Sequence, residues 1–133
     1  MSINDSFGGR LGQVYADTST QRLGFYVTED QSNPVNGCHG GALATFADMQ
    51  LLAIPGEVGG ALGHKPTISL SVDYFAPIEL GSWVEAKVIV ERETRSMVFT
   101  QAHISVGGRP VARATAIYHN RAIRTINNDH SSV

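Results

Sequence analysis

One apolar helical segment followed by long alternating strands is the pattern that most restricts how this chain can fold. Residues 40–54 are apolar nearly all round a predicted helix, which ends before Pro55. After residue 66 the hydrophobic period changes from about 3.6 to 2, which is typical of strands. A helix that is apolar on most sides has to be buried on most sides. The pattern therefore predicts an α+β domain, in which a curved antiparallel sheet wraps around one long central helix.

The predicted sheet has one strand before the helix and four strands after it. Aromatic and β-branched residues mark the first strand at residues 23–28, ahead of a turn-rich segment at 29–37. The alternation after residue 66 predicts a four-stranded antiparallel meander, with a hairpin turn at Gly107 and Gly108. Its alternating positions are Ile68, Leu70, Val72 and Tyr74, then Val84, Ala86, Val88 and Val90, and then Val98, Thr100, Ala102, Ile104 and Val106.

The two ends of the chain are poorer in apolar residues than its middle. Residues 1–22 are polar and contain glycines, with weak strand character around Val14, and we expect a loosely packed N-terminal arm there. Residues 125–133 have too little apolar content to pack against the rest, and we expect a flexible tail. The 133 residues thus form one domain, at 23–124, between an arm and a tail.

Charge and hydropathy exclude several classes of protein. The formal net charge of −2 offers no general field that would attract nucleic acid. No run approaches the roughly 18 apolar residues that a membrane span needs. The first five residues have neither the basic region nor the apolar region of a signal peptide. We therefore expect a cytoplasmic protein that binds neither nucleic acid nor a membrane.

The cysteine and histidine content argues against a metal site. Cys38 is the single cysteine, which excludes an internal disulfide and a Cys-rich zinc site. The five histidines have no metal-ligand spacing to one another or to the acids. Cys38 stands next to His39 on a turn, where neighbouring side chains point apart and do not easily form a Cys–His pair. We expect no metal in this protein.

Asp48 is the residue that most needs an explanation. A carboxylate on an apolar helix is costly to bury unless it is paired, hydrogen-bonded or used. The same helix begins with Gly40 and Gly41, whose N–H groups are open to a ligand, and the helix dipole favours an oxyanion there. Two plain interpretations stay open: the glycines can serve a tight, closely packed turn, and local hydrogen bonds can satisfy Asp48.

The spacing between the glycines and the acid predicts how the protein assembles. Seven or eight residues separate them, or about 10–12 Å along the helix axis, so one carbonyl group cannot contact both within a chain. If two such helices lie antiparallel across a two-fold axis, the helix start of one subunit comes level with Asp48 of the other. We therefore expect at least a homodimer with a shared site, and favour a homotetramer built as a dimer of dimers.

Two segments of the sequence together resemble a known family. The first runs from Asn33 through Gly37, His39, Gly40 and Gly41 to Asp48, and the second is the strand-like run of residues 67–77, Thr-Ile-Ser-Leu-Ser-Val-Asp-Tyr-Phe-Ala-Pro. In this combination they closely resemble the hotdog-fold acyl-CoA thioesterases of the phenylacetate-pathway (PaaI-like) type. The resemblance covers roughly residues 23–119 and implies the hotdog fold.

The resemblance also implies roles for individual residues. Asp48 would be the catalytic carboxylate, acting as general base on water or as nucleophile on the thioester carbon, and both roles stay open. The backbone N–H of Gly40 would polarise the thioester carbonyl, as in an oxyanion hole. Thr67 would help to hold the attacking water. Asn33 would orient water or the carbonyl, with Asn36 as a rival because it lies closer to the glycine turn.

Other residues near these motifs are candidates for a catalytic or a substrate contact. His39 could be a general acid, although its place in the motif favours fixing the loop by a hydrogen bond. Gly41 shares the helix start and could contact substrate. Residues 91–96, which include Arg92, Arg95 and Ser96, could bind the phosphates of coenzyme A, because arginine binds phosphate bidentately. A solvated charged turn is the alternative, and Lys65 and Arg113 are weaker candidates.

The function that these features favour is the hydrolysis of an acyl-CoA thioester to a free acid and coenzyme A, without a metal or an organic cofactor. The alternative is a non-catalytic acyl-CoA-binding hotdog module. Asp48 favours the enzyme, because a binding protein gains nothing from a desolvated acid that faces a thioester. A hotdog hydratase would need a paired Asp and His, which the motif does not supply. The sequence does not identify the acyl chain.

Overall fold

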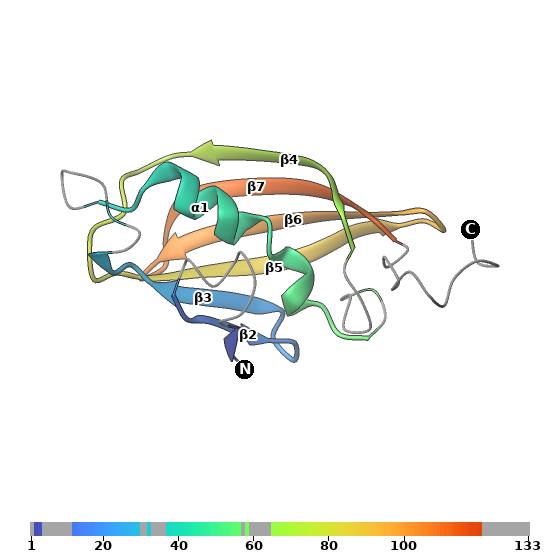
Figure 1. Cartoon of the computed structure of the whole chain (residues 1–133), viewed down its shortest axis with the longest axis horizontal. Helices are drawn as coiled ribbons and strands as arrows, with labels where there is room; N and C mark the ends of the chain where they lie inside the picture. Colours follow the sequence, from blue (N-terminus) through green and yellow to red (C-terminus); the bar gives the residue numbers. More distant parts are fainter. Residues whose placement is uncertain are drawn as a thin grey trace, which may run out of the picture.

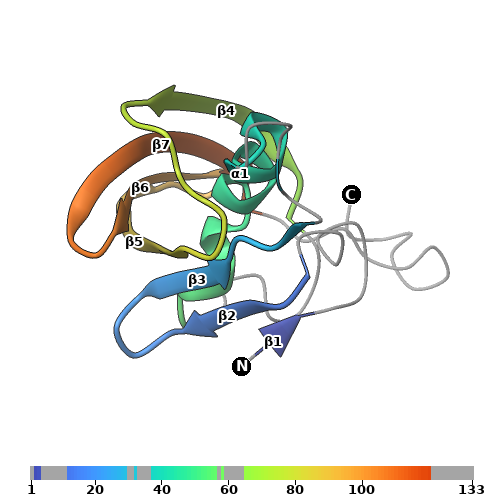
Figure 2. The same ribbon diagram turned by 90° about the vertical axis from the view of Figure 1, so that its left-hand side faces the viewer.

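The computed structural model describes residues 2–3, 12–29, 32, 37–56, 58 and 65–120. In this part of the chain, a curved antiparallel sheet holds one α-helix on its concave face (Figure 1 and Figure 2). The helix and the sheet agree with the predicted α+β architecture. No helix of the described residues is long and apolar enough to cross a membrane.

The described elements follow one another in a simple order. They are β1 (Ser2–Ile3), β2 (Val14–Asp17), β3 (Arg22–Tyr26), α1 (Gly40–Ala47), the 3-10 helix η3 (Gln50–Ala53), β4 (Thr67–Tyr74), β5 (Trp83–Glu93), β6 (Met97–Val106) and β7 (Arg109–His119). Across the sheet the strands lie in the order β1-β2-β3-β5-β6-β7-β4. Strand β4 is therefore an edge strand, although it lies in the middle of the sequence.

The alternating pattern correctly predicted which side chains of β5 and β6 face the core. Val84, Ala86 and Val88 are buried, as are the matching positions of β6 at Val98, Thr100, Ala102 and Ile104. The hairpin between β6 and β7 is also confirmed. Gly107 and Gly108 have φ angles of 57° and 83°, the left-handed conformation that a type I′ turn needs at both central positions.

The predicted four-stranded meander is wrong in its strand order. Only β5, β6 and β7 follow one another as neighbours, whereas β4 pairs with β7. Alternation identifies the buried face of a strand but not its neighbour. In the structure, Asp73 of β4 lies opposite Arg113 of β7, and the carboxylate and the guanidinium are 3.1 Å apart. A cross-strand pair of opposite charges favours this pairing.

The predicted helix over residues 40–54 is wrong in its length. α1 ends at Ala47, and η3 follows after Asp48 and Met49. Side chains replace the backbone donors that would have continued the helix. The amide of Gln50 donates to the carbonyl of Ala47 at 3.0 Å, and the hydroxyl of Tyr118 donates to the carbonyl of Asp48 at 2.9 Å. The apolar pattern could not reveal these two contacts.

The N-terminal segment at 1–22 is more than the loosely packed arm that we expected. Residues 14–17 form β2, which pairs with β3, and the side chain of Val14 is fully buried. Residues 1–22 contain too few hydrophobic positions to predict a strand that is buried mainly by the strands beside it. The predicted tail at 125–133 lies outside the described residues.

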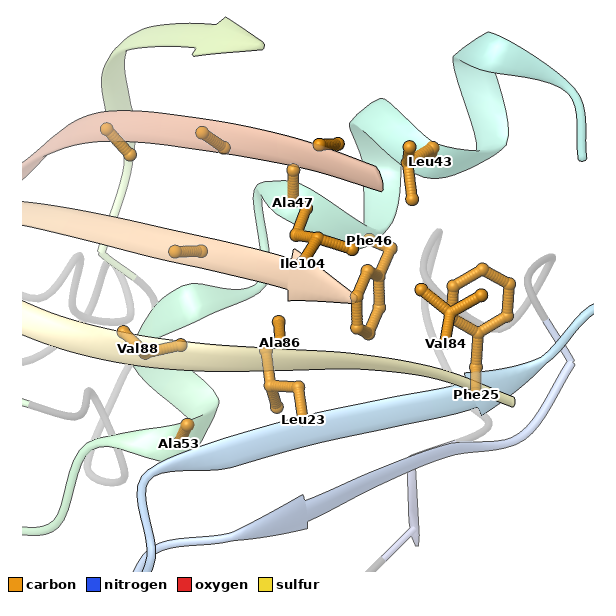
Figure 3. Packing of buried hydrophobic residues seen from close by; sticks show 14 of the residues in the cluster. Leu23, Phe25, Leu43, Phe46, Ala47, Ala53, Val84, Ala86, Val88 and Ile104 are labelled. Atoms are coloured by element: carbon orange, nitrogen blue, oxygen red, sulfur yellow. The ribbon is translucent and has the colours of Figure 1, made fainter. Parts of the chain in front are cut away.

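The core lies between α1 and the concave face of the sheet (Figure 3). Leu43, Phe46 and Ala47 are buried on the side of α1 that faces the strands. The ring of Phe46 points into the sheet and packs against Phe25 of β3, with 4.6 Å between ring centroids. Gly40 and Gly41 at the start of α1 are exposed. The described residues therefore cover one side of α1, not most sides.

Candidate active site

Asp48 is the C-cap residue of α1 and is half-buried. Its carboxylate accepts a hydrogen bond from the hydroxyl of Thr67, with 2.7 Å between Oδ1 and Oγ1. The C-terminal end of a helix carries partial negative charge, so a carboxylate there does not stabilise the helix. Helix stability therefore does not explain why Asp48 lies at this position. An acid that is hydrogen-bonded to a hydroxyl can hold a water molecule and accept a proton from it.

Thr67 reaches Asp48 because β4 begins with an irregularity. The register between β4 and β7 shifts between Thr67 and Ser69, so that two residues of β4 lie opposite one residue of β7. Such a β-bulge redirects a side chain. Simple alternation would place Thr67 on the face opposite to Leu70 and Val72, which pack against the core. The bulge instead turns the Thr67 hydroxyl toward α1.

Tyr118 is a site residue that the sequence analysis missed. It lies opposite Thr67 in the β4–β7 register and is almost fully buried. Its hydroxyl donates to the backbone carbonyl of Asp48. Burial, and then the negative charge of Asp48, raise the pKa of this hydroxyl above its ordinary value, so the group stays a donor. A tyrosine at an alternating core position of the last strand was the available signal.

His39 is the N-cap residue of α1 and acts locally in the structure. Its Nδ1 accepts a hydrogen bond from the N–H of Gly41 at 2.9 Å. A Cβ atom on residue 41 would lie 3.1 Å from this nitrogen, so the cap explains why residue 41 is a glycine. The loop-fixing role is confirmed, whereas a general-acid role stays a prediction. The N–H of Gly41 donates to His39 here, and its contact with substrate also stays a prediction.

Gly40 differs from Gly41 because contacts with the described residues do not require a glycine there. A Cβ atom there would have 3.8 Å to its nearest neighbour, the hydroxyl of Tyr74, which is an ordinary contact. A glycine inside a helix costs up to about 1 kcal/mol relative to alanine. No described residue accepts a hydrogen bond from its N–H. The geometry leaves this N–H for a group from outside the described chain.

The peptide unit that carries the N–H of Gly40 is also polarised. Its carbonyl belongs to His39 and accepts two helix N–H groups, from Ala42 at 3.0 Å and from Leu43 at 3.1 Å. Hydrogen bonds to the oxygen of an amide strengthen its N–H as a donor. The start of α1 can therefore offer a donor to an oxyanion, as expected for a helix N-terminus.

Arg92, Arg95 and Ser96 lie at the β5–β6 hairpin, at the same end of the sheet as Thr67. Asn120, which follows β7, donates its N–H to the carbonyl of Ser96 at 2.9 Å. The same residue accepts from the ammonium group of Lys65, two residues before Thr67, at 3.0 Å. The side chains of Arg92 and Arg95 are exposed, and no described carboxylate lies within ion-pair distance of them.

The remaining candidates are side chains that are already paired or buried, and residues outside the described part of the chain. Arg113 pairs with Asp73 and lies over the ring of Phe75, 5.5 Å from its centroid. Burial raises the pKa of the Cys38 thiol to about 11, which leaves it a poor nucleophile at neutral pH. Asn33 and Asn36 lie outside the described residues, so the structure does not choose between them.

The two chemical features of α1 lie at opposite ends of the helix. Gly40 is its first residue and Asp48 its C-cap, which separates them by about 12 Å at 1.5 Å per residue. One thioester carbonyl cannot contact both groups in the same chain. The geometry agrees with the separation that the sequence predicts.

A curved antiparallel sheet around one helix is the architecture of the hotdog fold, which similar solved structures share. A family model described as "Thioesterase superfamily" matches residues 36–123. The chain belongs to this superfamily.

Individual relatives agree with this assignment. The Pseudomonas aeruginosa protein named "Putative esterase PA0474" is 27% identical over 117 residues, which cover 82% of this chain and 84% of that protein. A variant of the phenylacetic acid degradation protein PaaI from Thermus thermophilus has a TM-score of 0.64 at 25% identity, covering 74% of this chain and 82% of the other. A hypothetical thioesterase from Streptococcus pneumoniae, solved with coenzyme A, has a TM-score of 0.65 at 20% identity, covering 78% and 82%.

A pair of variants separates capping by His39 from catalysis by its ring. His39→Ala should lose about 0.5–2 kcal/mol of unfolding free energy, as expected for a lost N-cap. His39→Asn should keep most of that stability, because asparagine is a strong N-cap residue. Urea unfolding measures the difference, and thiol release from an acyl-CoA measures activity. An active His39→Asn protein supports the cap, whereas equal inactivity of both folded variants would show a chemical role for the ring.

Proposed function

We propose that the protein is an acyl-CoA thioesterase, which hydrolyses an acyl-CoA thioester to a free carboxylic acid and coenzyme A. The observation that carries the proposal is the Asp48 carboxylate, half-buried at the end of α1 and hydrogen-bonded to Thr67. Membership of the thioesterase superfamily supports the reaction class. The structural relative solved with coenzyme A supports the class of substrate.

The proposed reaction needs one base and one group that stabilises an oxyanion. Asp48 takes a proton from a water molecule held beside Thr67, and the water oxygen forms a bond to the thioester carbon. The carbonyl oxygen gains negative charge and is stabilised by the N–H of Gly40. Collapse of this intermediate breaks the carbon–sulfur bond, and the leaving thiolate takes the proton from Asp48. Both products leave without a metal or an organic cofactor.

Asp48 could instead attack the thioester carbon directly. This route would expel the thiolate, which takes its proton from solvent, and form a mixed anhydride, which water then hydrolyses. Single-turnover hydrolysis in ¹⁸O-labelled water separates the two routes. Water that attacks the Asp48 carbonyl of the anhydride leaves ¹⁸O in the carboxyl group of Asp48, a label that only the nucleophilic route can produce, whereas the general-base route places ¹⁸O in the released acid alone.

The site is proposed to be shared between two subunits. The described strands leave one edge of β4 unpaired, along its eight residues. Ile68 and Tyr74 of this strand and Phe75 directly after it are between 46% and 53% exposed, so large side chains with apolar surface lie along this edge. A long exposed edge strand is a template for pairing with another chain. A second copy of this strand is the proposed occupant, and it would place two α1 helices near a two-fold axis.

The proposal also covers how dimers assemble further and where in the cell the protein lies. The outer face of the sheet carries Tyr15 and Tyr26 around Trp83, with ring centroids 5.8 and 4.7 Å away, and this patch could join two dimers into a homotetramer. A cytoplasmic location is proposed from the single cysteine, which is in keeping with a reducing compartment. Sedimentation and fractionation of the cells that make the protein would test these two statements.

Loss of the Asp48 carboxylate should abolish most of the activity. We expect Asp48→Asn to lower kcat by a factor of hundreds or more, with a small change in KM, because the base or nucleophile is removed while the shape is kept. Thr67→Ala should have a smaller effect, since Thr67 is proposed only to hold water. Thiol release over a panel of acyl-CoA esters measures both. The reverse order of the two losses would contradict these roles.

The same panel tests the alternative function. A protein that binds acyl-CoA esters in calorimetry and releases no thiol from any of them is a binding module, and the thioesterase proposal then fails. An Asp48→Asn protein that hydrolyses thioesters at the wild-type rate would also contradict the proposal, because the Asp48 carboxylate would then have no part in the reaction.

The exposed arginines at the β5–β6 hairpin should act on substrate binding. Arg92→Ala and Arg95→Ala are expected to raise KM for a CoA ester more than they lower kcat, because contacts to distant phosphates stabilise ground and transition states alike. Arg109→Ala, an exposed arginine at the other end of β6 and β7, is the matched control. Unchanged KM in both hairpin variants would leave residues 91–96 as a solvated turn.

Mixing two inactive variants tests the shared site. Gly40→Pro removes the proposed oxyanion donor at a position that accepts proline, because residue 40 begins the helix and His39 before it is extended (φ −65°, ψ 134°). In mixed dimers with Asp48→Asn, one of the two sites keeps both groups. After full exchange of equal amounts, half of the dimers are mixed and about a quarter of wild-type activity should return. No recovery after proven exchange would show that each chain holds its own site.

A further inference from the structure

The interruption between α1 and η3 is built by two side chains that have no proposed role in the reaction. The hydroxyl of Tyr118 donates to the carbonyl of Asp48 at 2.9 Å. The side-chain amide of Gln50 donates to the carbonyl of Ala47. These contacts supply hydrogen-bond donors to the carbonyls of Ala47 and Asp48, so the helix can end at Asp48.

Ending the helix in this way leaves a polar atom of the core unpaired within the described part of the chain. Gln50 is fully buried, and its Oε1 has no hydrogen-bond partner among the described residues. A buried polar atom without a partner costs stability. An apolar residue at position 50 would avoid this cost. The unpaired Oε1 offsets the hydrogen bond that Nε2 donates to Ala47, so a glutamine there contributes little net stability.

The interruption does have a consequence for the acid. Asp48 takes φ −84° and ψ 1°, outside regular helix geometry, and its carboxylate meets Thr67. Tyr118 and Thr67 are opposite residues of β7 and β4. One of them holds the main chain of Asp48 and the other holds its side chain. The same pair of strands thus controls both where Asp48 lies and where its carboxylate points.

We infer that Tyr118 and Gln50 are positioning residues, which end α1 at Asp48 and so direct its carboxylate to Thr67. This inference rests on the proposed function for its effect on activity. It also predicts the position of the Asp48 carboxylate, which a crystal structure can measure even if the protein has no activity.

The first test removes one hydroxyl and keeps the ring that fills the core. Tyr118→Phe is expected to lower kcat about tenfold or more, with KM changed less than twofold, because small displacements of a reacting group cost much of the rate. In an Asp48→Asn background the same change should have little further effect, because Tyr118 acts through Asp48. Tyr26→Phe, on the outer face of the sheet beside Trp83, is the matched control and should retain wild-type kcat.

The second test uses stability and activity together. Gln50→Met replaces the buried amide by an apolar side chain of similar length, so it should lower kcat severalfold while the midpoint of thermal unfolding stays the same or rises. Thr100→Val is the matched control: its buried Oγ1 also lacks a described partner, and it should raise or keep the midpoint with kcat unchanged. A Gln50→Met protein with a lower midpoint and wild-type kcat would show that Gln50 serves only the fold.

A crystal structure of Tyr118→Phe decides the inference even if the protein hydrolyses no thioester. The inference expects the contact between Asp48 and Thr67 to be lost or lengthened beyond hydrogen-bond distance. An unchanged 2.7 Å contact together with wild-type kcat overturns it in an active enzyme. In an inactive protein, where the thioesterase proposal itself has failed, the unchanged contact alone overturns it.

Discussion

The attachment of α1 to the concave face of the sheet determines where the candidate site lies. Leu43 and Phe46 bury their side chains against the strands, and burial of two such residues contributes several kcal/mol. Two tyrosine hydroxyls hold the ends of the helix: Tyr74 donates to the carbonyl of Gly40 at 2.8 Å, and Tyr118 to that of Asp48 at 2.9 Å. Each contributes about 1 kcal/mol at most. Packing therefore keeps α1 on the sheet, while the hydroxyls fix its two ends.

Features that lower stability gather at these two ends. Gly40 lies in a helix although no described residue would clash with a side chain there, Asp48 places a carboxylate at the negative end of the helix dipole, and Gln50 buries an oxygen without a described partner. Deviations from local rules are expected where a protein binds or reacts. Their gathering at the ends of α1 supports a site there more strongly than any single residue does.

The exposed edge of β4 connects the fold to the proposed assembly. The helix separates Gly40 from Asp48 by a distance that a single carbonyl cannot span. The described residues leave part of α1 and one side of β4 without cover. A second copy at this edge would address both facts, because it supplies the missing cover and the other half of each site. The proposed reaction and the proposed dimer thus depend on the same geometry.

The sequence by itself determined the features that follow from local pattern. Period-2 alternation identified the buried faces of β5 and β6, the glycine pair identified the hairpin between β6 and β7, and the two motif segments at residues 33–48 and 67–77 identified the family. These succeed because backbone geometry links the period of a pattern to the face of an element.

Only the tertiary structure decided which elements meet. It placed β4 beside β7 rather than in a meander, added β2 to the sheet, and brought Thr67 to Asp48 through a bulge. It also ended α1 at Asp48, because the donors from Tyr118 and Gln50 replace the backbone bonds of a longer helix. Tyr118 lies 70 residues from Asp48 in the sequence. Periodicity describes residues a few positions apart, and it carries no information on contacts that chain folding makes at such a separation.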